Sequence, residues 1–211
     1  MKSKTPAKPK KASNKIIDFI CFFLISISGL VIVALATDTF KSPFTVALAI
    51  LIIIPTVIAM VTGAPFVPTP IARVKKMLEL AKIKRGEKVY DIGCGDGRMV
   101  YLAAKDYGAD ATGFELSPLV FCLAKIRQWI WRSKARIVFT DFRRRNLADA
   151  DVIVCYLMPD ALARLQDKLE KELKPGTRVV SYAFQIGTWQ PAHREERDRP
   201  HNLAPIWVYE R

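Results

Sequence analysis

The segment Val89–Arg98, VYDIGCGDGR, constrains the fold of this chain more than any other part of its sequence. Its first residues favour a β-strand, and three glycines at alternate positions, Gly93, Gly95 and Gly97, lead into an expected helix over Met99–Lys105. Glycines permit a tight turn and a close approach of the backbone to a ligand. The start of a helix also offers N–H groups that lack intrahelical partners. The segment therefore predicts a strand, a ligand-binding loop and a helix in succession.

Stretches typical of strands and helices alternate along residues 71–211. Apolar residues at helical spacing predict helices over Ile71–Ile83, Met99–Lys105, Pro118–Trp131 and Asp160–Leu173. Apolar runs bounded by turn residues predict strands over Lys88–Ile92, Ala111–Glu115, Ala135–Phe139, Val152–Leu157, Arg178–Ala183 and Pro205–Glu210. This alternation implies an α/β fold with a mostly parallel sheet, helices on both faces, and a ligand site at the carboxyl ends of the strands.

The spacing of the glycines excludes two common nucleotide sites. A dinucleotide-binding loop needs the pattern G-x-G-x-x-G. Counted from Gly93, the last glycine of that pattern is replaced by Arg98, and counted from Gly95 it is replaced by Val100. No Gly-Lys-Ser/Thr follows, so the segment is not a P-loop either.

The segment resembles instead motif I of class I S-adenosylmethionine-dependent methyltransferases, D-x-G-x-G-x-G. The resemblance extends over about Ile71 to Tyr209. It implies a Rossmann-like methyltransferase fold with a mostly parallel seven-stranded sheet, and S-adenosylmethionine as the cofactor. Asp96 is expected near the methionine moiety of the cofactor. The cofactor-binding residues that the motif implies are Asp91, Gly93, Gly95, Asp96 and Gly97.

Three further residues complete the cofactor site that the resemblance implies. Glu115 ends the second expected strand within TGFELSP, 24 residues after Asp91, and corresponds to the acid that binds both ribose hydroxyls in this family. Asp141 follows the third expected strand, at the position that contacts the adenine amino group. Phe142 is expected to pack on the adenine ring.

The acceptor side is expected at YLMP, Tyr156–Pro159, where methyltransferases present the group to be methylated. Amino-group methylases of nucleic acid usually carry an Asn/Asp-Pro-Pro-aromatic motif there, so its absence argues against base methylation. Tyr156 is expected to orient an amine beside Pro159, in an apolar channel that lowers the pKa of a lysine. Asp160 either accepts the proton of that amine or caps the following helix, and capping is the commoner role at a helix start.

A more specific resemblance combines several segments. A hydrophobic N-terminal stretch followed by PFVPTP, DIGCGDGR, GFELSP and YLMP resembles the adenine-nucleotide-translocase and ATP-synthase c-subunit lysine methyltransferases and their bacterial relatives. This implies a protein-lysine N-methyltransferase that acts on a membrane protein, and Phe66–Pro68 then become candidates for a lid over the cofactor. The alternatives are a methyltransferase of quinones or lipids, an RNA methyltransferase, and an inactive cofactor-binding scaffold. The intact glycine motif and Glu115 argue against the scaffold.

The first 63 residues contain two long apolar runs. Ile16–Thr37 has 22 residues and a single charge, and Pro43–Gly63 has 21 residues and no charge. Because a membrane-spanning helix needs about 20 apolar residues, these runs predict a transmembrane hairpin with the lipid bilayer as a partner. Lysines and arginines at both outer ends place these ends in the cytoplasm. The expected localisation is the bacterial inner membrane, multi-pass, with a cytoplasmic catalytic domain.

The predicted organisation therefore has four parts. Residues 1–15 form a basic, disordered tail with six lysines, residues 16–63 the hairpin, residues 64–70 a proline-rich connector, and residues 71–211 the methyltransferase domain. The net charge of +13 fits an anionic membrane surface as well as nucleic acid. The run Arg143–Arg145 is expected to be a solvated loop rather than a phosphate-binding site.

Cysteine and histidine spacing gives no indication of a metal. The four cysteines form no C-x-x-C pair, so neither a disulfide framework nor a zinc site is expected. His193 and His201 are expected on a polar surface loop, and Trp129 is expected to pack against its own helix layer. No metal is therefore expected as a cofactor.

Overall fold

The computed structural model describes residues 42–43, 46–47, 50–51, 54 and 66–211 of the chain. Two compact units are distinguished, Met1–Ala49 and Ile50–Arg211, and nearly all described residues belong to the second. The predicted basic tail lies outside the described residues. The predicted hairpin over residues 16–63 also lies almost entirely outside them.

The predicted localisation in a membrane is wrong, because the described helices contradict it. Within the described residues no helix is long and apolar enough to cross a bilayer. The longest helix among them, α6 (Pro159–Glu172), has 14 residues. At about 1.5 Å per residue such a helix reaches roughly 21 Å, which is short of the roughly 30 Å hydrocarbon core. Seven of its residues are charged as well.

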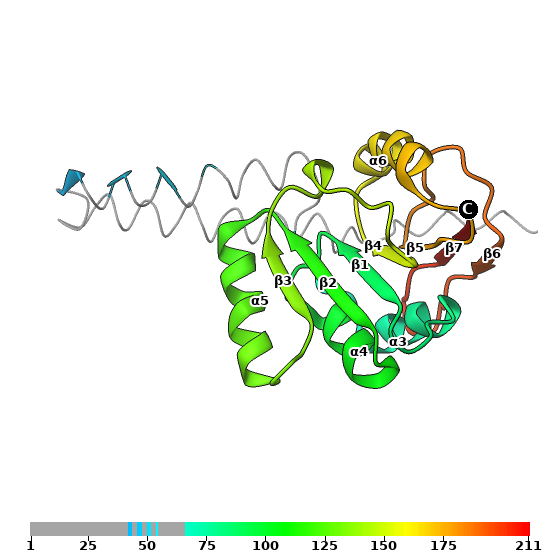
Figure 1. The fold of residues 1–211 in the computed structure, drawn as a ribbon, viewed down its shortest axis with the longest axis horizontal. Coiled ribbons are helices and arrows are strands. Elements are labelled where there is room, and N and C mark those ends of the chain that lie inside the picture. Colours follow the sequence, from blue (N-terminus) through cyan, green and yellow to red (C-terminus); the bar gives the residue numbers. More distant parts are fainter. Residues whose placement is uncertain (1–41, 44–45, 48–49, 52–53, 55–65) are drawn as a thin grey trace, which may run out of the picture. The chain divides into compact units, whose positions relative to one another are not determined.

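Residues 66–211 form an α/β fold around a seven-stranded sheet of order β3-β2-β1-β4-β5-β7-β6 (Figure 1). The strands are β1 (Lys88–Ile92), β2 (Asp110–Glu115), β3 (Arg136–Phe139), β4 (Val152–Cys155), β5 (Arg178–Tyr182), β6 (His193–Glu195) and β7 (Ile206–Glu210). Strands β1 to β5 are parallel, whereas β7 runs antiparallel to β5 and to β6. The mostly parallel seven-stranded sheet that the family resemblance implied is thus confirmed.

The helices cover the two faces of the sheet unequally. The other helices within residues 66–211 are α3 (Ile71–Leu80), α4 (Arg98–Tyr107), α5 (Pro118–Ile130) and the short 3-10 helix η2 (Phe142–Arg144). One buried cluster joins residues of α3, α4 and α5 to one face of the sheet. A second cluster joins Leu162, Leu165 and Leu169 of α6 to the opposite face. In Figure 1, α6 lies accordingly on the side of the sheet away from α3, α4 and α5.

One strand was not expected from the residue pattern. The sequence predicts a surface loop around His193, but residues His193–Glu195 form β6 and pair with β7. These residues are polar and largely exposed, so they show no apolar alternation. The strand exists because the neighbouring β7 offers main-chain groups for pairing.

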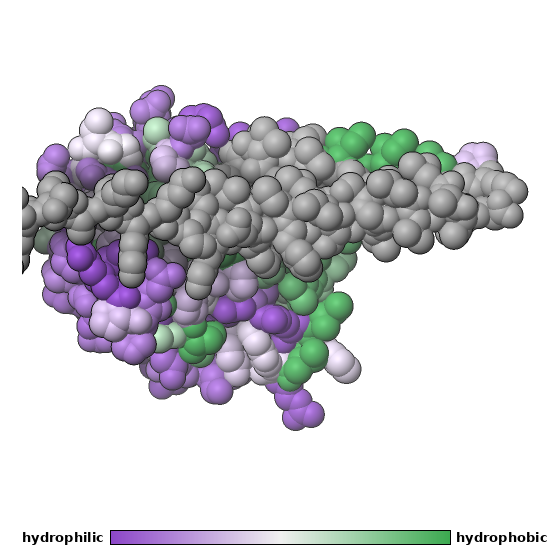
Figure 2. Space-filling model, turned by 180° about the vertical axis from the view of Figure 1, so that it is seen from behind, coloured by the Kyte–Doolittle hydropathy of each residue, from purple (hydrophilic) through white to green (hydrophobic). Residues whose placement is uncertain are grey.

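Helix α5 is poorly covered. Ala124 is the single buried residue of this helix, which lies wholly within the described part of the chain. Figure 2 shows apolar side chains exposed at the surface over α5, and the exposed apolar residues of the helix include Leu119, Ile126 and Ile130. The expected packing of Trp129 is wrong, because its side chain is 81% exposed. Helical spacing alone did not reveal which face the neighbouring strands leave open.

Close contact between β2 and the loop after β1 positions the ligand site. The backbone N–H groups of Gly93 and Cys94 both donate to the carbonyl of Phe114, at 3.1 and 3.0 Å. A Cβ atom at Gly113 would stand 2.6 Å from the Cβ of Cys94, which no pair of side chains tolerates. The absence of a side chain at Gly113 therefore lets the loop lie directly on β2.

Candidate active site

The three motif glycines adopt left-handed backbone conformations. The φ angles are +75° at Gly93, +57° at Gly95 and +79° at Gly97. Other residues adopt this region at a cost of about 1–2 kcal/mol, so the turn requires glycine at these positions. Gly97 is the N-cap of α4, which brings the start of this helix to the carboxyl edge of β1.

Glu115 is held by the backbone at the end of β2. Its Oε1 accepts hydrogen bonds from the N–H groups of Leu116 at 2.9 Å and Ser117 at 2.8 Å, and its Oε2 accepts one from Gly95 at 3.0 Å. Burial raises the pKa of Glu115, and these three bonds only partly offset the rise. A carboxylate offers about four acceptor positions, so one remains on Oε2 for a ligand hydroxyl.

Asp91 lies buried near the end of β1, beside Glu115 and the glycine loop. Burial raises its pKa well above the usual range, and the nearby negative charges of Glu115 and Asp96 raise it further. A positively charged ligand at this edge would counteract both effects. S-adenosylmethionine carries such charges on its sulfonium and ammonium groups, so the setting of Asp91 fits the cofactor that the motif implies.

Asp96 is bound by two arginines. Its side chain is 2% exposed and accepts hydrogen bonds from Arg98 Nε at 2.9 Å and from Arg127 Nη1 of α5. Arg98 Nη1 also donates to the carbonyl of Thr69 at 2.8 Å. Asp96 thus ties the glycine loop to α5 and to the segment before α3. Its expected contact with the methionine moiety stays a prediction.

Residues 66–70 lie along the glycine loop. A Cβ atom at Gly95 would stand 2.8 Å from the ring atom Cε2 of Phe66. Thr69 is buried, and its carbonyl is fixed by Arg98. The aromatic ring therefore covers one side of the loop, which is the placement that a cofactor lid at Phe66 requires.

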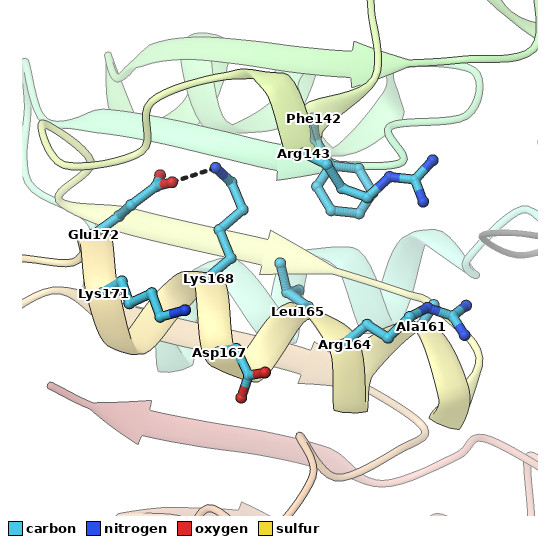
Figure 3. A pocket seen from close by; sticks show the side chains of 9 residues that line it. All are labelled: Phe142, Arg143, Ala161, Arg164, Leu165, Asp167, Lys168, Lys171 and Glu172. Atoms are coloured by element: carbon cyan, nitrogen blue, oxygen red, sulfur yellow. Dashed lines mark hydrogen bonds and ion pairs between the residues drawn. The ribbon is translucent and has the colours of Figure 1, made fainter.

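Asp141 and Phe142 stand at the end of β3, where η2 begins. The Asp141 carboxylate accepts hydrogen bonds from the backbone N–H of Arg143 at 3.0 Å and from its Nε at 2.9 Å. Although burial raises the pKa of Asp141, these bonds and the charges of Arg143 and Arg144 bring it below its usual value. The carboxylate is therefore ionised and able to accept a bond from an amino group. Phe142 is half-buried and turns toward α6 (Figure 3).

Two tyrosines meet at the ends of β4 and β5. Cys155 and Ser181 are register partners, so the next residues, Tyr156 and Tyr182, lie side by side. Their ring centroids are 4.9 Å apart at an interplanar angle of 74°. Burial raises the pKa of Tyr156, and the neighbouring Tyr182 raises it further. The residue pattern did not indicate Tyr182, because the register of β4 and β5 that places it beside Tyr156 is set only by the fold.

Pro159 and Asp160 begin α6 and are exposed to solvent. Met158 occupies the N-cap position, and within the described residues no side chain caps this helix start. The interpretation of Asp160 as the cap is therefore wrong: it lies inside the first turn, where its charge favours the helix through the dipole. Proton acceptance by Asp160 stays a prediction.

Comparison with known proteins agrees with this geometry. The family described as ANTKMT methyltransferase domain matches residues 91–193. A protein-lysine N-methyltransferase of Saccharolobus islandicus is 42% identical over 134 residues, which cover 62% of this chain and 83% of the relative. The adenine nucleotide translocase lysine N-methyltransferase of Mus musculus is 36% identical over 151 residues, which cover 69% of this chain and 62% of the relative.

A further relative and a solved structure are also similar to this chain. The ATP-synthase c-subunit lysine N-methyltransferase of Mus musculus is 32% identical over 148 residues, so the match spans 69% of this chain and 58% of that relative. The crystal structure of an RNA methyltransferase from Salinibacter ruber in complex with S-adenosyl-L-homocysteine is 32% identical. Its TM-score is 0.63, and the match covers 68% of this chain and 93% of that one. The glycine loop, the Glu115 carboxylate and these matches together show that the chain belongs to the S-adenosylmethionine-dependent protein-lysine N-methyltransferases, the family of the adenine-nucleotide-translocase and ATP-synthase c-subunit enzymes.

Proposed function

We propose that this protein methylates a lysine side chain of a membrane protein. The observation that carries the proposal is the contact of the half-buried Tyr156 with the buried Tyr182 at the carboxyl ends of β4 and β5. Two relatives are named for lysines of the ATP-synthase c-subunit and of the adenine nucleotide translocase, both membrane proteins. The match covers about three-fifths of the length of these mouse relatives, so their substrate class is proposed here and not their particular substrates.

The cofactor site is proposed to comprise residues from three strand ends. The backbone of the glycine loop approaches the cofactor, Glu115 accepts a ribose hydroxyl at its remaining position, and Asp91 faces the positively charged methionine end. Asp141 accepts the adenine amino group and Phe142 packs on the ring. When bound, the cofactor supplies a methyl group that its sulfonium already activates for transfer, so the protein mainly has to orient and desolvate the reactants.

A lysine must lose its proton before it can accept a methyl group. The two tyrosine rings would present apolar surface to the amine, and such surroundings disfavour its charged form. Because the pKa of Tyr156 is raised, its phenol keeps its proton at neutral pH and acts as an orienting hydrogen-bond partner rather than as a base. Pro159 would bound this channel, and the exposed Asp160 would receive the proton that the amine releases.

Methylation of RNA is the second candidate. The Salinibacter ruber structure named as an RNA methyltransferase supports it, with 32% identity across nearly its whole length. The segment Tyr156–Pro159 argues against base methylation, because it lacks the Asn/Asp-Pro-Pro-aromatic motif. We propose the lysine reaction because the family matches name it repeatedly.

Labelled-methyl transfer from S-adenosylmethionine tests the proposal. The full chain is incubated with membranes and RNA, after which membrane protein, lipid and RNA are separated and counted. We expect the label in membrane protein, as methyl-lysine after acid hydrolysis, and less of it with the Glu115→Ala variant at a limiting cofactor concentration. Label in RNA or in lipid, with membrane protein at background, would refute the lysine proposal.

The domain boundaries are proposed together with this function. Residues 71–211 would form the methyltransferase domain, and residues 64–70 would lead into it. Because Phe66 and Thr69 contact the glycine loop through Gly95 and Arg98, this leading segment also contributes to the site. A truncation meant to isolate the domain should therefore retain residue 66.

A further inference from the structure

A groove separates η2 from α6 on the face of the sheet that α6 covers (Figure 3). It encloses about 360 Å³. Phe142 from η2 and Leu165 from α6 point toward one another across it, and Ala161 lies at its end near the start of α6. Its floor is therefore apolar.

Charged side chains surround this floor. Four cationic residues and two carboxylates line the groove, so cations are in excess; they are Arg143, Arg164, Lys168, Lys171, Asp167 and Glu172. Lys171 is exposed on α6. Arg144 and Arg145 follow Arg143 and are exposed as well, which extends the positive charge beyond the groove.

The walls of the groove are fixed by bonds within each wall and by one bond from α6 to the segment after η2. Glu172 pairs with Lys168 on the same helix and accepts a hydrogen bond from the backbone N–H of Leu147 at 2.9 Å. Arg143 pairs with Asp141 at 2.7 Å, which fixes the opposite wall. A partner would therefore meet a site that is already formed, and ordering costs little of the binding energy.

The groove begins near Pro159, which is proposed to bound the acceptor channel. Ala161 lies two residues after Pro159, and Phe142 follows Asp141. From Ala161 to Glu172 the helix rises about 16 Å at roughly 1.5 Å per residue. An extended peptide covers that length with about five residues at roughly 3.3 Å each. A short segment flanking a lysine in the channel therefore matches the groove in length.

We propose that this groove binds an acidic segment of the acceptor protein, next to the lysine that is methylated. An apolar side chain of this segment packs against Ala161 and Leu165, which leaves Phe142 to the adenine ring, and its carboxylates approach Arg164 and Lys171. This inference rests on the proposed lysine function and names the kind of sequence that the acceptor presents.

Peptide binding to the full chain tests the inference. The probes are a short fluorescent peptide with one lysine, one leucine and flanking glutamates, and its counterpart with glutamines, both in the presence of S-adenosylhomocysteine. We expect the acidic peptide to bind more tightly, and increasingly so at low salt. The double variant Arg164→Glu/Lys171→Glu should weaken its binding about tenfold, from two lost attractions and two new repulsions.

A matched variant controls for net charge. Lys75→Glu/Lys134→Glu changes the charge equally at exposed residues of α3 and of the turn after α5, which belong to the opposite face of the sheet. It should leave peptide binding unchanged, and both variants should retain the melting temperature and cofactor affinity of the wild type. Equal binding of both peptides, or equal losses in both variants, would overturn the inference.

Two further outcomes distinguish this inference from RNA binding and from the proposed lysine methylation. An RNA oligonucleotide that binds more tightly than the acidic peptide, and is released by Arg164→Glu/Lys171→Glu, would overturn the peptide assignment. Because the binding measurement needs no turnover, absence of methyl-lysine in membrane protein would refute the proposed function alone. Charge-dependent binding of the acidic peptide would then still support the groove.

Discussion

At the ends of β1 and β2 main-chain groups hold the functional carboxylate, whereas at the ends of β4 and β5 two aromatic side chains hold each other. Three backbone N–H groups fix Glu115, and backbone turns fix the loop around it. Tyr156 and Tyr182 are positioned by ring contact and by the register of two neighbouring strands. The geometry at the cofactor side is therefore fixed by the backbone. The geometry at the acceptor side depends on a few side chains and changes when they are replaced. One cofactor is thereby compatible with different acceptors.

The largest expected effect is the loss of cofactor affinity when Glu115 is replaced. Glu115→Ala removes the ribose acceptor and leaves three N–H groups without their partner. We expect S-adenosylmethionine to bind more weakly by about 1–3 kcal/mol, measured by calorimetry. Glu79→Ala, at an exposed position of α3, is the control and should bind normally. An unchanged affinity in Glu115→Ala would remove the backbone-held carboxylate from the proposed cofactor site.

Gly95→Ala tests whether the glycine loop depends on Phe66. Gly86→Ala is the matched control, because Gly86 also has a positive φ while a Cβ there would meet no described atom within 4 Å. Each substitution should cost about 1–2 kcal/mol of unfolding free energy for the left-handed backbone. Gly95→Ala should cost more than its control, since its Cβ meets the Phe66 ring, and should weaken cofactor binding too. Denaturant unfolding measures the difference, and equal losses would argue against a close ring.

Tyr156→Phe tests the acceptor edge. Loss of the phenol oxygen removes one orienting hydrogen bond, worth about 1 kcal/mol, so methyl transfer to lysine should slow about fivefold. Cofactor affinity should stay the same, which separates the two edges. Tyr182→Phe is the comparison variant: its oxygen accepts from the backbone N–H of Ala204 at 3.2 Å, so its loss should act more on stability than on rate. A cofactor defect in Tyr156→Phe would contradict the separation.

The smallest expected effect is a change of stability with pH at Asp91. The pKa of Asp91 is raised in the folded protein above its usual value of 3.8, so the folded state binds this proton more tightly than the unfolded state does. The wild type therefore loses stability as the pH rises from 3.8 through the raised pKa. Asp91→Asn carries no such charge and should melt higher than the wild type at neutral pH but not at pH 3, while binding S-adenosylmethionine less tightly. A lower melting temperature at neutral pH would contradict the burial of an unfavourable charge.

Local sequence signals predicted the parts of the fold that local physics determines. The glycine spacing defined the loop after β1. Apolar runs located six strands, and for each of them at least one expected end lies within one residue of the observed end. Of the seven strands in residues 66–211, only β6 had no apolar pattern. The roles of Asp91, Glu115 and Asp141 stay predictions, although these residues do meet at one edge of the sheet. Sequence spacing was sufficient here because consecutive parallel strands bring their carboxyl ends together.

Pairings between distant residues were not predictable in the same way. Nothing near Asp96 in the sequence shows that Arg127 reaches it across 31 positions, and nothing near Tyr156 shows that Tyr182 is its neighbour. The exposure of Trp129 likewise depends on which face of α5 the sheet leaves uncovered. The prediction of a membrane location used the length of two apolar runs alone, and the described helices do not support it.

The missing side chain at Gly113 restricts how this sequence can diverge. Because a Cβ there would collide with the Cβ and Sγ of Cys94, an alanine at 113 is tolerated only after residue 94 has become glycine. The reverse order passes through a variant whose glycine loop no longer fits on β2. Mutations at these two positions therefore have a preferred historical order, and related sequences should change there as a pair.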